Sequence, residues 1–375
     1  MRATLTRQAG LSLIELMIAI TIGLFLLVGL VSVFATSNQT YLDLSRAAQQ
    51  IENGRFAVQV LSDDIAHAGF YGRYSQPGTL PPGPGLPDPC VKTVTIPPLP
   101  APPAPQLSTL QLAMALPIQG YDGPTLATLP ADLSVCLPDA NHLAGTDVLV
   151  IRRADSTMST GDAAHGLATD PAATLTAGNI YLQANADSGV APVIAVATGN
   201  QANDETPPLF SLKNKDPGPP LIFAPVRRYH VHIYFVAPCS VPADGTSVCV
   251  NDGTDDNGAP IPTLKRIELT STGVMSVIPL VEGIENFQVD YGIDTDKDGV
   301  PDGAYITAPT LANFADVVAV RISVLARNIQ PSSGPADTKS YDMGVMGFVT
   351  PGGAYRRHVY NAVIRVVNPA SRRES

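Results

Sequence analysis

The first part of the chain is dominated by one long apolar stretch, which runs from Leu11 to Ala35 and contains a single charged residue, Glu15. About 20 such residues cross the hydrocarbon core of a bilayer as a helix, so the pattern predicts a membrane-spanning helix over residues 11–35. The preceding residues 1–10 carry Arg2 and Arg7 and no acidic residue. Because basic segments stay on the cytoplasmic side, the pattern predicts a cytoplasmic N-terminus and a chain that continues across the membrane.

Glu15 is unusual within such a stretch. A carboxylate at the centre of a membrane span costs about 2.5–3.5 kcal/mol on insertion scales, so the residue is a functional candidate. A cleaved secretory signal peptide fits poorly, because the apolar stretch is too long and contains this charge. An uncleaved signal anchor fits the length of the stretch but gives Glu15 no role.

After Ala35 the apolar residues recur every three or four positions, which predicts an amphipathic helix that packs on a folded domain over residues 36–71. Gly69 is a typical helix stop, so one long helix is expected from about Leu11 to about His67. The residues of the expected buried stripe are Leu44, Ala48, Ile51, Arg55, Val58, Leu61 and Ile65.

The remaining residues, 72–375, read as a β-rich domain with long loops. Alternating or continuous apolar runs predict strands, separated by segments rich in glycine, asparagine, aspartate and serine. The expected strands lie at residues 147–153, 180–183, 192–197, 220–226, 229–236, 265–269, 276–280, 287–293, 315–324 and 358–367. One helix followed by many strands predicts an α+β fold, in which a long N-terminal helix packs on a largely antiparallel sheet.

Residues 77–106 are rich in proline and are expected to form a surface insertion in this domain. Polyproline segments and turns suit this composition, and a stiff connection is favoured over a ligand for a proline-recognising module.

A short acidic segment follows the expected strand that ends at Ile293. It matches the pattern D-x-D-x-D-G-x-x-D, with Asp294, Asp296, Asp298, Gly299 and Asp302 at the defined positions. Calcium takes six to eight oxygen ligands, and aspartates spaced around a glycine turn can converge on one ion, with the carbonyl of Val300 as a further ligand. The twelfth position holds Tyr305 where an EF-hand has glutamate, so the pattern predicts at most a partial calcium site. A solvated acidic turn is the alternative.

His230 and His232 share one face of the strand expected at 229–236. Two histidines at this spacing can share a metal ion, but no third ligand is evident nearby, so an ordinary strand face is favoured.

The chain has a formal net charge of −10, which argues against general nucleic-acid binding. Its four cysteines form no C-x-x-C pair, and outside the cytoplasm they can form disulfides. Of three possible connectivities we favour Cys239–Cys249, which closes a short polar loop, together with Cys90–Cys136; free buried thiols are the alternative.

The sequence contains no P-loop, no G-x-S-x-G, no H-E-x-x-H and no dinucleotide-binding fingerprint. We therefore predict a non-catalytic protein, with a membrane-tethered enzyme outside the cytoplasm as the competing class.

The basic leader, Gly10, a glutamate five positions later and the long apolar run together resemble the processing site of type IV pilins and type II secretion pseudopilins. The resemblance implies that a prepilin peptidase cleaves between Gly10 and Leu11 and that the new N-terminus of Leu11 is methylated. In an assembled fibre, Glu15 would then pair with the terminal amine of Leu11 on a neighbouring subunit. Such pairs are strong in a low dielectric and can fix the register between subunits.

Two further segments resemble the PilW group of minor pilins, namely residues 52–71 and the block from Leu280 to Asp302 that ends in the acidic segment. The resemblance implies a subunit that primes type IV pilus assembly in the inner membrane and ends at the extracellular pilus tip. Its implied partners are other minor pilins, the major pilin and a large tip adhesin. A GspJ-like minor pseudopilin of type II secretion shares the leader, helix and sheet, and is the closest alternative.

Overall fold

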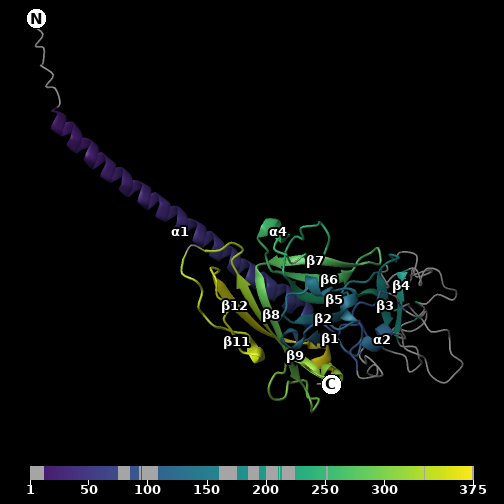
Figure 1. The fold of residues 1–375 in the computed structure, drawn as a ribbon. Coiled ribbons are helices and arrows are strands. Elements are labelled where there is room, and N and C mark those ends of the chain that lie inside the picture. Colours follow the sequence, from purple (N-terminus) through teal and green to yellow (C-terminus); the bar gives the residue numbers. More distant parts are fainter. Residues whose placement is uncertain are drawn as a thin grey trace, which may run out of the picture. The chain divides into compact units, whose positions relative to one another are not determined.

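The computed structural model describes residues 12–74, 85–92, 94, 109–159, 175–184, 194–199, 210, 212, 224–250, 252–332 and 334–373. The chain divides into two compact units, Met1–Gln49 and Gln50–Ser375. The second unit, which we call the head, contains every strand that the structure describes. Its architecture is α+β, as the sequence predicts (Figure 1).

One helix, α1, extends from Leu13 to His67 and belongs partly to each unit. Two residues after the helix, Gly69 has a φ of +74°, a backbone conformation that favours glycine and is common just after helices. The buried residues of α1 are Gln50, Gly54, Ala57, Leu61, Asp64 and Ile65. The expected stripe is therefore correct at Leu61 and Ile65, half-buried at Val58, and wrong at four residues that are exposed, Leu44, Ala48, Ile51 and Arg55.

A seven-stranded sheet, the large sheet, forms one layer of the head. Its strands pair in the order β1-β2-β5-β3-β4, and β6 pairs with both β5 and β7. The long strand β5 is the centre of this sheet. It pairs with β2 along one edge; along the other edge it pairs first with β3 and then, further along β5, with β6. The strands are β1 (Ile118–Tyr121), β2 (Val148–Ala154), β3 (Ile180–Ala184), β4 (Ile194–Thr198), β5 (Val226–Ala237), β6 (Thr263–Leu269) and β7 (Met275–Glu282).

A second sheet, the small sheet, has the order β12-β9-β8. Its strands are β8 (Ile284–Ile293), β9 (Val317–Arg327) and β12 (Arg357–Arg365). A two-stranded hairpin pairs β10 (Tyr341–Asp342) with β11 (Phe348–Val349). Every strand pair that the structure describes is antiparallel. The short α-helices are α2 (Thr109–Ala113), α4 (Asp255–Gly258), α5 (Leu311–Phe314) and α6 (Val367–Arg373), and the 3-10 turns are η1 (Gly123–Thr125), η2 (Leu133–Val135), η3 (Asp139–Asn141) and η6 (Gly344–Met346).

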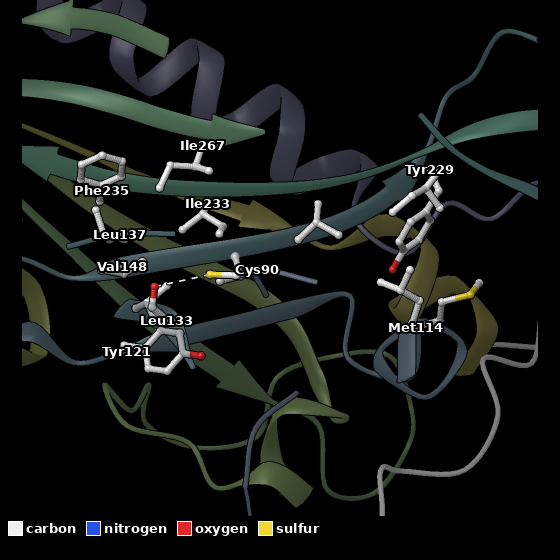
Figure 2. Packing of buried hydrophobic residues seen from close by; sticks show 14 of the residues in the cluster. Cys90, Met114, Tyr121, Leu133, Leu137, Val148, Tyr229, Ile233, Phe235 and Ile267 are labelled. Carbon is white, nitrogen blue, oxygen red and sulfur yellow. Dashed lines mark hydrogen bonds between the residues drawn. The ribbon is translucent and has the colours of Figure 1, made fainter. Parts of the chain in front are cut away.

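The large sheet has a hydrophobic core on each face. On one face, Leu149, Ile151 and Tyr234 pack with Leu61 of α1 and with Phe287 of the small sheet. The opposite face is covered by α2 and the loops that include Cys90 and Leu133; Figure 2 shows Val148, Ile233 and Phe235 in this core. The alternation of side chains along β2 and β5 therefore serves two buried faces.

The structure contains both disulfides that the sequence favours, Cys90–Cys136 and Cys239–Cys249. Most of the expected strands are present, although β12 ends at Arg365 and its last predicted residue, Val367, begins helix α6. Pro369 fits there because proline is tolerated in the first turn of a helix. Most of the strand expected at 220–226 and most of the proline-rich segment lie outside the described residues.

Candidate functional site

At the start of α1, the side chain of Glu15 forms a local hydrogen bond with the backbone. The backbone N–H of Ser12 donates to Oε2 of Glu15 at 3.0 Å. The first N–H groups of a helix lack intrahelical partners, and a glutamate three residues after a serine supplies one such partner in a capping box. The S-x-x-E spacing is visible in the sequence, although no role for Ser12 was predicted from it. Gly10 and Leu11 lie outside the described residues.

The apolar part of α1 makes this the one helix, among the described residues, that is long and apolar enough to cross a membrane. Threonine hydroxyl groups of this part are satisfied within the helix. Thr21 donates to the carbonyl of Met17 at 2.7 Å, and Thr36 donates to the carbonyl of Ser32 at 2.9 Å. Such bonds remove the cost of placing a hydroxyl in an apolar environment.

The acidic segment after β8 folds into a turn that we call the aspartate loop, residues 294–302. One carboxylate oxygen from each of Asp294, Asp296 and Asp302 lies within 4.8 Å of the others. Asp298, which the sequence also suggests as a ligand, is not part of this group; its Oδ1 accepts from the N–H of Val300 at 2.8 Å. The loop therefore presents three convergent carboxylates, the oxygen donors that calcium prefers.

The turn itself is fixed by Asp294, whose side chain is completely buried. Its Oδ1 accepts from the N–H of Lys297 at 2.7 Å, and its Oδ2 accepts from the N–H of Gly299 at 3.0 Å. Gly299 has a φ of +87°, which explains the need for glycine at this position. Asp302 closes the loop by accepting from the backbone and the hydroxyl of Thr295, both at 2.7 Å.

An arginine from the C-terminal helix also reaches the aspartate loop. Nη1 of Arg373 donates to Oδ2 of Asp294 at 3.0 Å, and Nη2 donates to Asp316 at 2.6 Å. Lys297 makes a second ion pair with Asp316. This role of Arg373 was not predicted from the sequence. The same helix bonds to the end of α1, since Arg372 donates to the carbonyl of Gly69 at 2.6 Å.

The charges of the loop are unevenly compensated. Despite its burial, hydrogen bonds from Arg373, Gly299 and Lys297 hold the pKa of Asp294 below its ordinary value. Asp296 accepts a hydrogen bond from the N–H of Asp298, which opposes protonation, but the neighbouring negative charges prevail and raise its pKa. A cation bound between the three carboxylates would relieve this repulsion, so the residues fit calcium.

His230 and His232 do not form a metal centre with each other in the structure. Nε2 of His230 lies 3.0 Å from Asp155, and Nδ1 of His232 lies 2.7 Å from Oδ2 of Asp64. Asp64 also accepts from the hydroxyl of Tyr234 at 2.8 Å. These histidines are not in either metal-ligand group found among the described residues.

The buried carboxylate of Asp64 therefore joins α1 to the large sheet. Its second oxygen pairs with Nε of Arg153 from β2 at 2.5 Å. Burial raises the pKa of Asp64, but the charges of His232 and Arg153 outweigh burial and leave the pKa well below its ordinary value. An aspartate in an otherwise apolar helix face is the signal that could have predicted this contact.

The second metal-ligand group consists of Cys239, Cys249 and Asp255. Because the two cysteines form a disulfide, their sulfur atoms cannot act as thiolate ligands. Asp255 instead accepts from the backbone N–H of Ala243 at 2.9 Å and shapes the loop that the disulfide closes.

Comparison with known proteins identifies two parts of the chain. Residues 250–368 match the family model described as Type IV Pilus-assembly protein W, and residues 5–31 match the Prokaryotic N-terminal methylation motif. The first match covers β6 to β12 and the aspartate loop but less than half of the chain. The second contains Gly10, Leu11 and Glu15.

No curated protein sequence matches the chain. Among solved structures, the chain is similar to a type IV-like pilin from Thermus thermophilus, with 15% identity over 37% of this chain and 78% of that chain. The TM-score of 0.19 is too low for this similarity to support a conclusion about function or arrangement.

Proposed function

We propose that the chain is a PilW-type minor pilin, and that it takes part in type IV pilus assembly as a non-catalytic subunit that helps to prime the fibre. The observation that carries the proposal is the match over residues 250–368, because a methylation motif alone is shared by pilins and pseudopilins. A long, strand-rich head suits a subunit at the tip, where no further subunit stacks above it.

Assembly begins with processing at the N-terminus. A prepilin peptidase cleaves between Gly10 and Leu11 on the cytoplasmic side, and the amine of Leu11 is methylated. The match over residues 5–31 and the apolar helix that follows support this step. Before assembly, the subunit spans the inner membrane once, with the head on the periplasmic side.

The partners of this subunit are the other minor pilins, the major pilin and a tip adhesin. In the fibre, Glu15 pairs with the methylated amine of Leu11 on a neighbouring subunit. The local bond between Glu15 and Ser12 leaves the carboxylate one oxygen for this pairing, because the N–H of Ser12 contacts Oε2.

The aspartate loop binds calcium with Asp294, Asp296 and Asp302, and with the carbonyl of Val300 as a further ligand. The convergence of the three carboxylates supports this assignment. When bound, calcium supplies positive charge between carboxylates that otherwise repel one another. Through Arg373 and Arg372, the loop is linked to α6 and to the end of α1, so calcium stabilises the attachment of that helix.

A minor pseudopilin of type II secretion is the alternative function, because it requires the same leader and helix. A strain that lacks this chain separates the alternatives when both surface pili and type II secretion are measured. If the chain is a minor pilin, its deletion reduces surface pili and leaves type II secretion intact; a loss of secretion with normal pili would favour the pseudopilin.

The direct test of processing is the mass of the N-terminal peptide from membrane fractions, with and without prepilin peptidase. We expect a peptide that begins at N-methylated Leu11 and that disappears in the strain without the peptidase. A peptide that retains Met1 in both strains would overturn the pilin assignment and leave the apolar helix as a signal anchor. The variant G10A retains a small residue at the cleavage position, whereas G10L does not, so the pair tests whether size limits the cleavage.

A further inference from the structure

The small sheet ends at an unprotected edge strand. β12 is nine residues long, and it pairs with β9 in continuous register from Arg357 to Arg365. It contains no proline, bulge or lysine, which are the devices that keep other strands from adding to a sheet edge. One edge strand of the large sheet, β7, has such devices, since it contains Pro279 and pairs with β6 through a register shift.

The hydrogen-bond pattern shows which residues of β12 face this edge. The N–H of Val366 donates to the carbonyl of Val318. Because the register is continuous, the backbone N–H and carbonyl groups of the even-numbered residues of β12 point towards β9. The intervening residues point their N–H and carbonyl groups away from β9. Within the part of the chain that the structure describes, the outward backbone groups of Val359, Asn361 and Val363 form no hydrogen bond to another segment. The first residue of the strand is covered, because the Tyr341 hydroxyl donates to the carbonyl of Arg357 at 3.3 Å.

Exposed apolar side chains lie beside this edge. Val363 is 62% exposed and is paired across the sheet with Arg321, which in turn bonds to Asp290 at 2.7 Å. The turn η6, between β10 and β11, sits on the same ion pair, since the N–H of Val345 lies 3.3 Å from Asp290. This hairpin also exposes Phe348, by 74% of its surface. Large apolar side chains that are exposed near unpaired backbone are candidates for an interaction site.

The charge of the segment indicates the chemistry of the partner. The chain as a whole carries a net charge of −10, yet residues 343–373 contain five arginines and no acidic residue. Arg357 and Arg373 pair with carboxylates of the head, whereas the side chains of Arg356, just before β12, and of His358 and Arg365, within it, are exposed. An approaching strand would therefore meet a positive edge, and acidic side chains on that strand would be favoured.

We propose that the outer edge of β12 binds an extended segment of a partner protein that alternates apolar and acidic residues. The segment adds a strand to the small sheet, its backbone bonds to Val359, Asn361 and Val363, and its apolar side chains cover Val363 and Phe348. Main-chain hydrogen bonds give such complexes their affinity, and alternate side chains give them their specificity. This surface follows from the head alone and does not depend on the proposed assembly role.

The test uses the purified full chain in detergent micelles and two synthetic peptides, one that alternates valine with glutamate and one that alternates valine with lysine. Amide hydrogen exchange is followed in the segment that contains Val359, Asn361 and Val363. We expect the glutamate peptide to slow exchange there and the lysine peptide to have no effect. Unchanged exchange with the glutamate peptide, or equal protection by both peptides, would overturn the proposal.

Two pairs of variants sharpen the result. N361P removes an outward N–H donor without removing any bond to β9, and N361T retains the donor as its matched control. Loss of one net hydrogen bond should weaken peptide binding about threefold to tenfold in N361P only. If N361P fails to fold, V363E and V363K decide the question at an exposed side chain, with weaker binding expected for V363E and tighter binding for V363K.

Protection that appears without peptide and grows with protein concentration would assign the edge to a second copy of this chain, against the proposal. Because the assay contains no pilus, its failure leaves the assembly role open. Conversely, an unprocessed N-terminus would overturn the assembly role and leave this binding result unchanged.

Discussion

The aromatic ring of Tyr360 occupies the space in which a side chain at residue 54 would lie. A Cβ atom added to Gly54 of α1 would come within 2.1 Å of Cε2 of Tyr360 in β12. The glycine is buried and lies in the middle of the helix, where it costs about 1 kcal/mol of helix stability relative to alanine. Its presence is explained by the close approach of the helix to the small sheet.

We expect G54A to destabilise the head, because the new methyl group must displace the Tyr360 ring. Overpacking of this kind costs about 1–3 kcal/mol, against a gain of about 1 kcal/mol in helix propensity. In a Y360A background the same change should become stabilising, because only the propensity gain remains. Denaturant unfolding of the four proteins in one detergent measures this reversal of sign, and its absence would show that Tyr360 is not the cause.

Asp64 should be the most costly single residue to neutralise in the contact between α1 and the large sheet. D64N removes a buried charge that pairs with Arg153 and His232, and breaking one side of a buried pair costs about 3–5 kcal/mol. The adjacent D63N is the matched control, since Asp63 is exposed. Equal unfolding free energies for the two variants would contradict a structural role for the Asp64 carboxylate.

The same residue predicts a dependence on acid. Because the pKa of Asp64 is lower in the folded than in the unfolded chain, its contribution is complete above about pH 4 and is lost as the pH falls below that value. The unfolding free energy of the unchanged chain should therefore fall more steeply between about pH 4 and pH 2 than that of D64N. Parallel curves for the two proteins would contradict the lowered pKa.

The contribution of Asp147 to the unfolding free energy should change with pH in the opposite direction. Burial raises its pKa to about 8, and the N–H groups of Val289 and Gly123, at 2.7 and 2.9 Å, lower it by less. The folded chain then holds a proton that the unfolded chain releases, so this contribution is complete below about pH 4 and is lost as the pH rises towards 8. Between pH 4 and pH 8, the unfolding free energy of D147N should decline less than that of the unchanged chain. D147N should also be less stable at every pH, because it accepts one hydrogen bond fewer.

The contrast between these residues shows what the sequence could and could not predict. The strands were readable because apolar residues alternate or run continuously along β5, β8 and β9. The position of Asp64 on an apolar helix face indicates a buried polar contact, but its partners His232 and Arg153 are distant in sequence and meet it only in the fold.

The helix face and the aspartate loop follow the same rule. The apolar pattern predicted the burial of Leu61 and Ile65. The need for glycine at residue 54 depends instead on the ring of Tyr360, which lies in the small sheet. The loop sequence predicted convergent carboxylates, whereas the contribution of Arg373 required the C-terminal segment to form a helix that returns to the loop. Polar contacts between distant segments carry no periodic signal.

Calcium should stabilise the head through the aspartate loop. At a free concentration about tenfold above the dissociation constant, the gain is about 1.4 kcal/mol. We expect D296N to abolish the calcium response and to leave the melting temperature in chelator unchanged, because Asp296 is exposed and supports only a weak bond from Asp298 at 3.3 Å. D294N should lower the melting temperature even in chelator, because Arg373 loses one of its two carboxylate partners.

D298N is the matched control for the calcium measurement, since the Asp298 carboxylate lies outside the convergent group. It should retain the response to calcium. Loss of the response in D298N but not in D296N would move the ligand set away from the three carboxylates identified here. The same melting temperature for the unchanged chain in chelator and in calcium would remove the site altogether.

Glu15 combines two roles that one pair of variants can separate. Its side chain accepts the N–H of Ser12, a local bond that any carbonyl oxygen could make, and its charge is available for the amine of a neighbouring subunit. E15Q retains the acceptor and removes the charge, whereas E15A removes both. If the charge pairing drives assembly, incorporation of E15Q into pili should fall as far as that of E15A, although both proteins reach the membrane and are cleaved. Assembly of E15Q at the level of the unchanged chain, with E15A defective, would instead show that the residue acts by starting the helix.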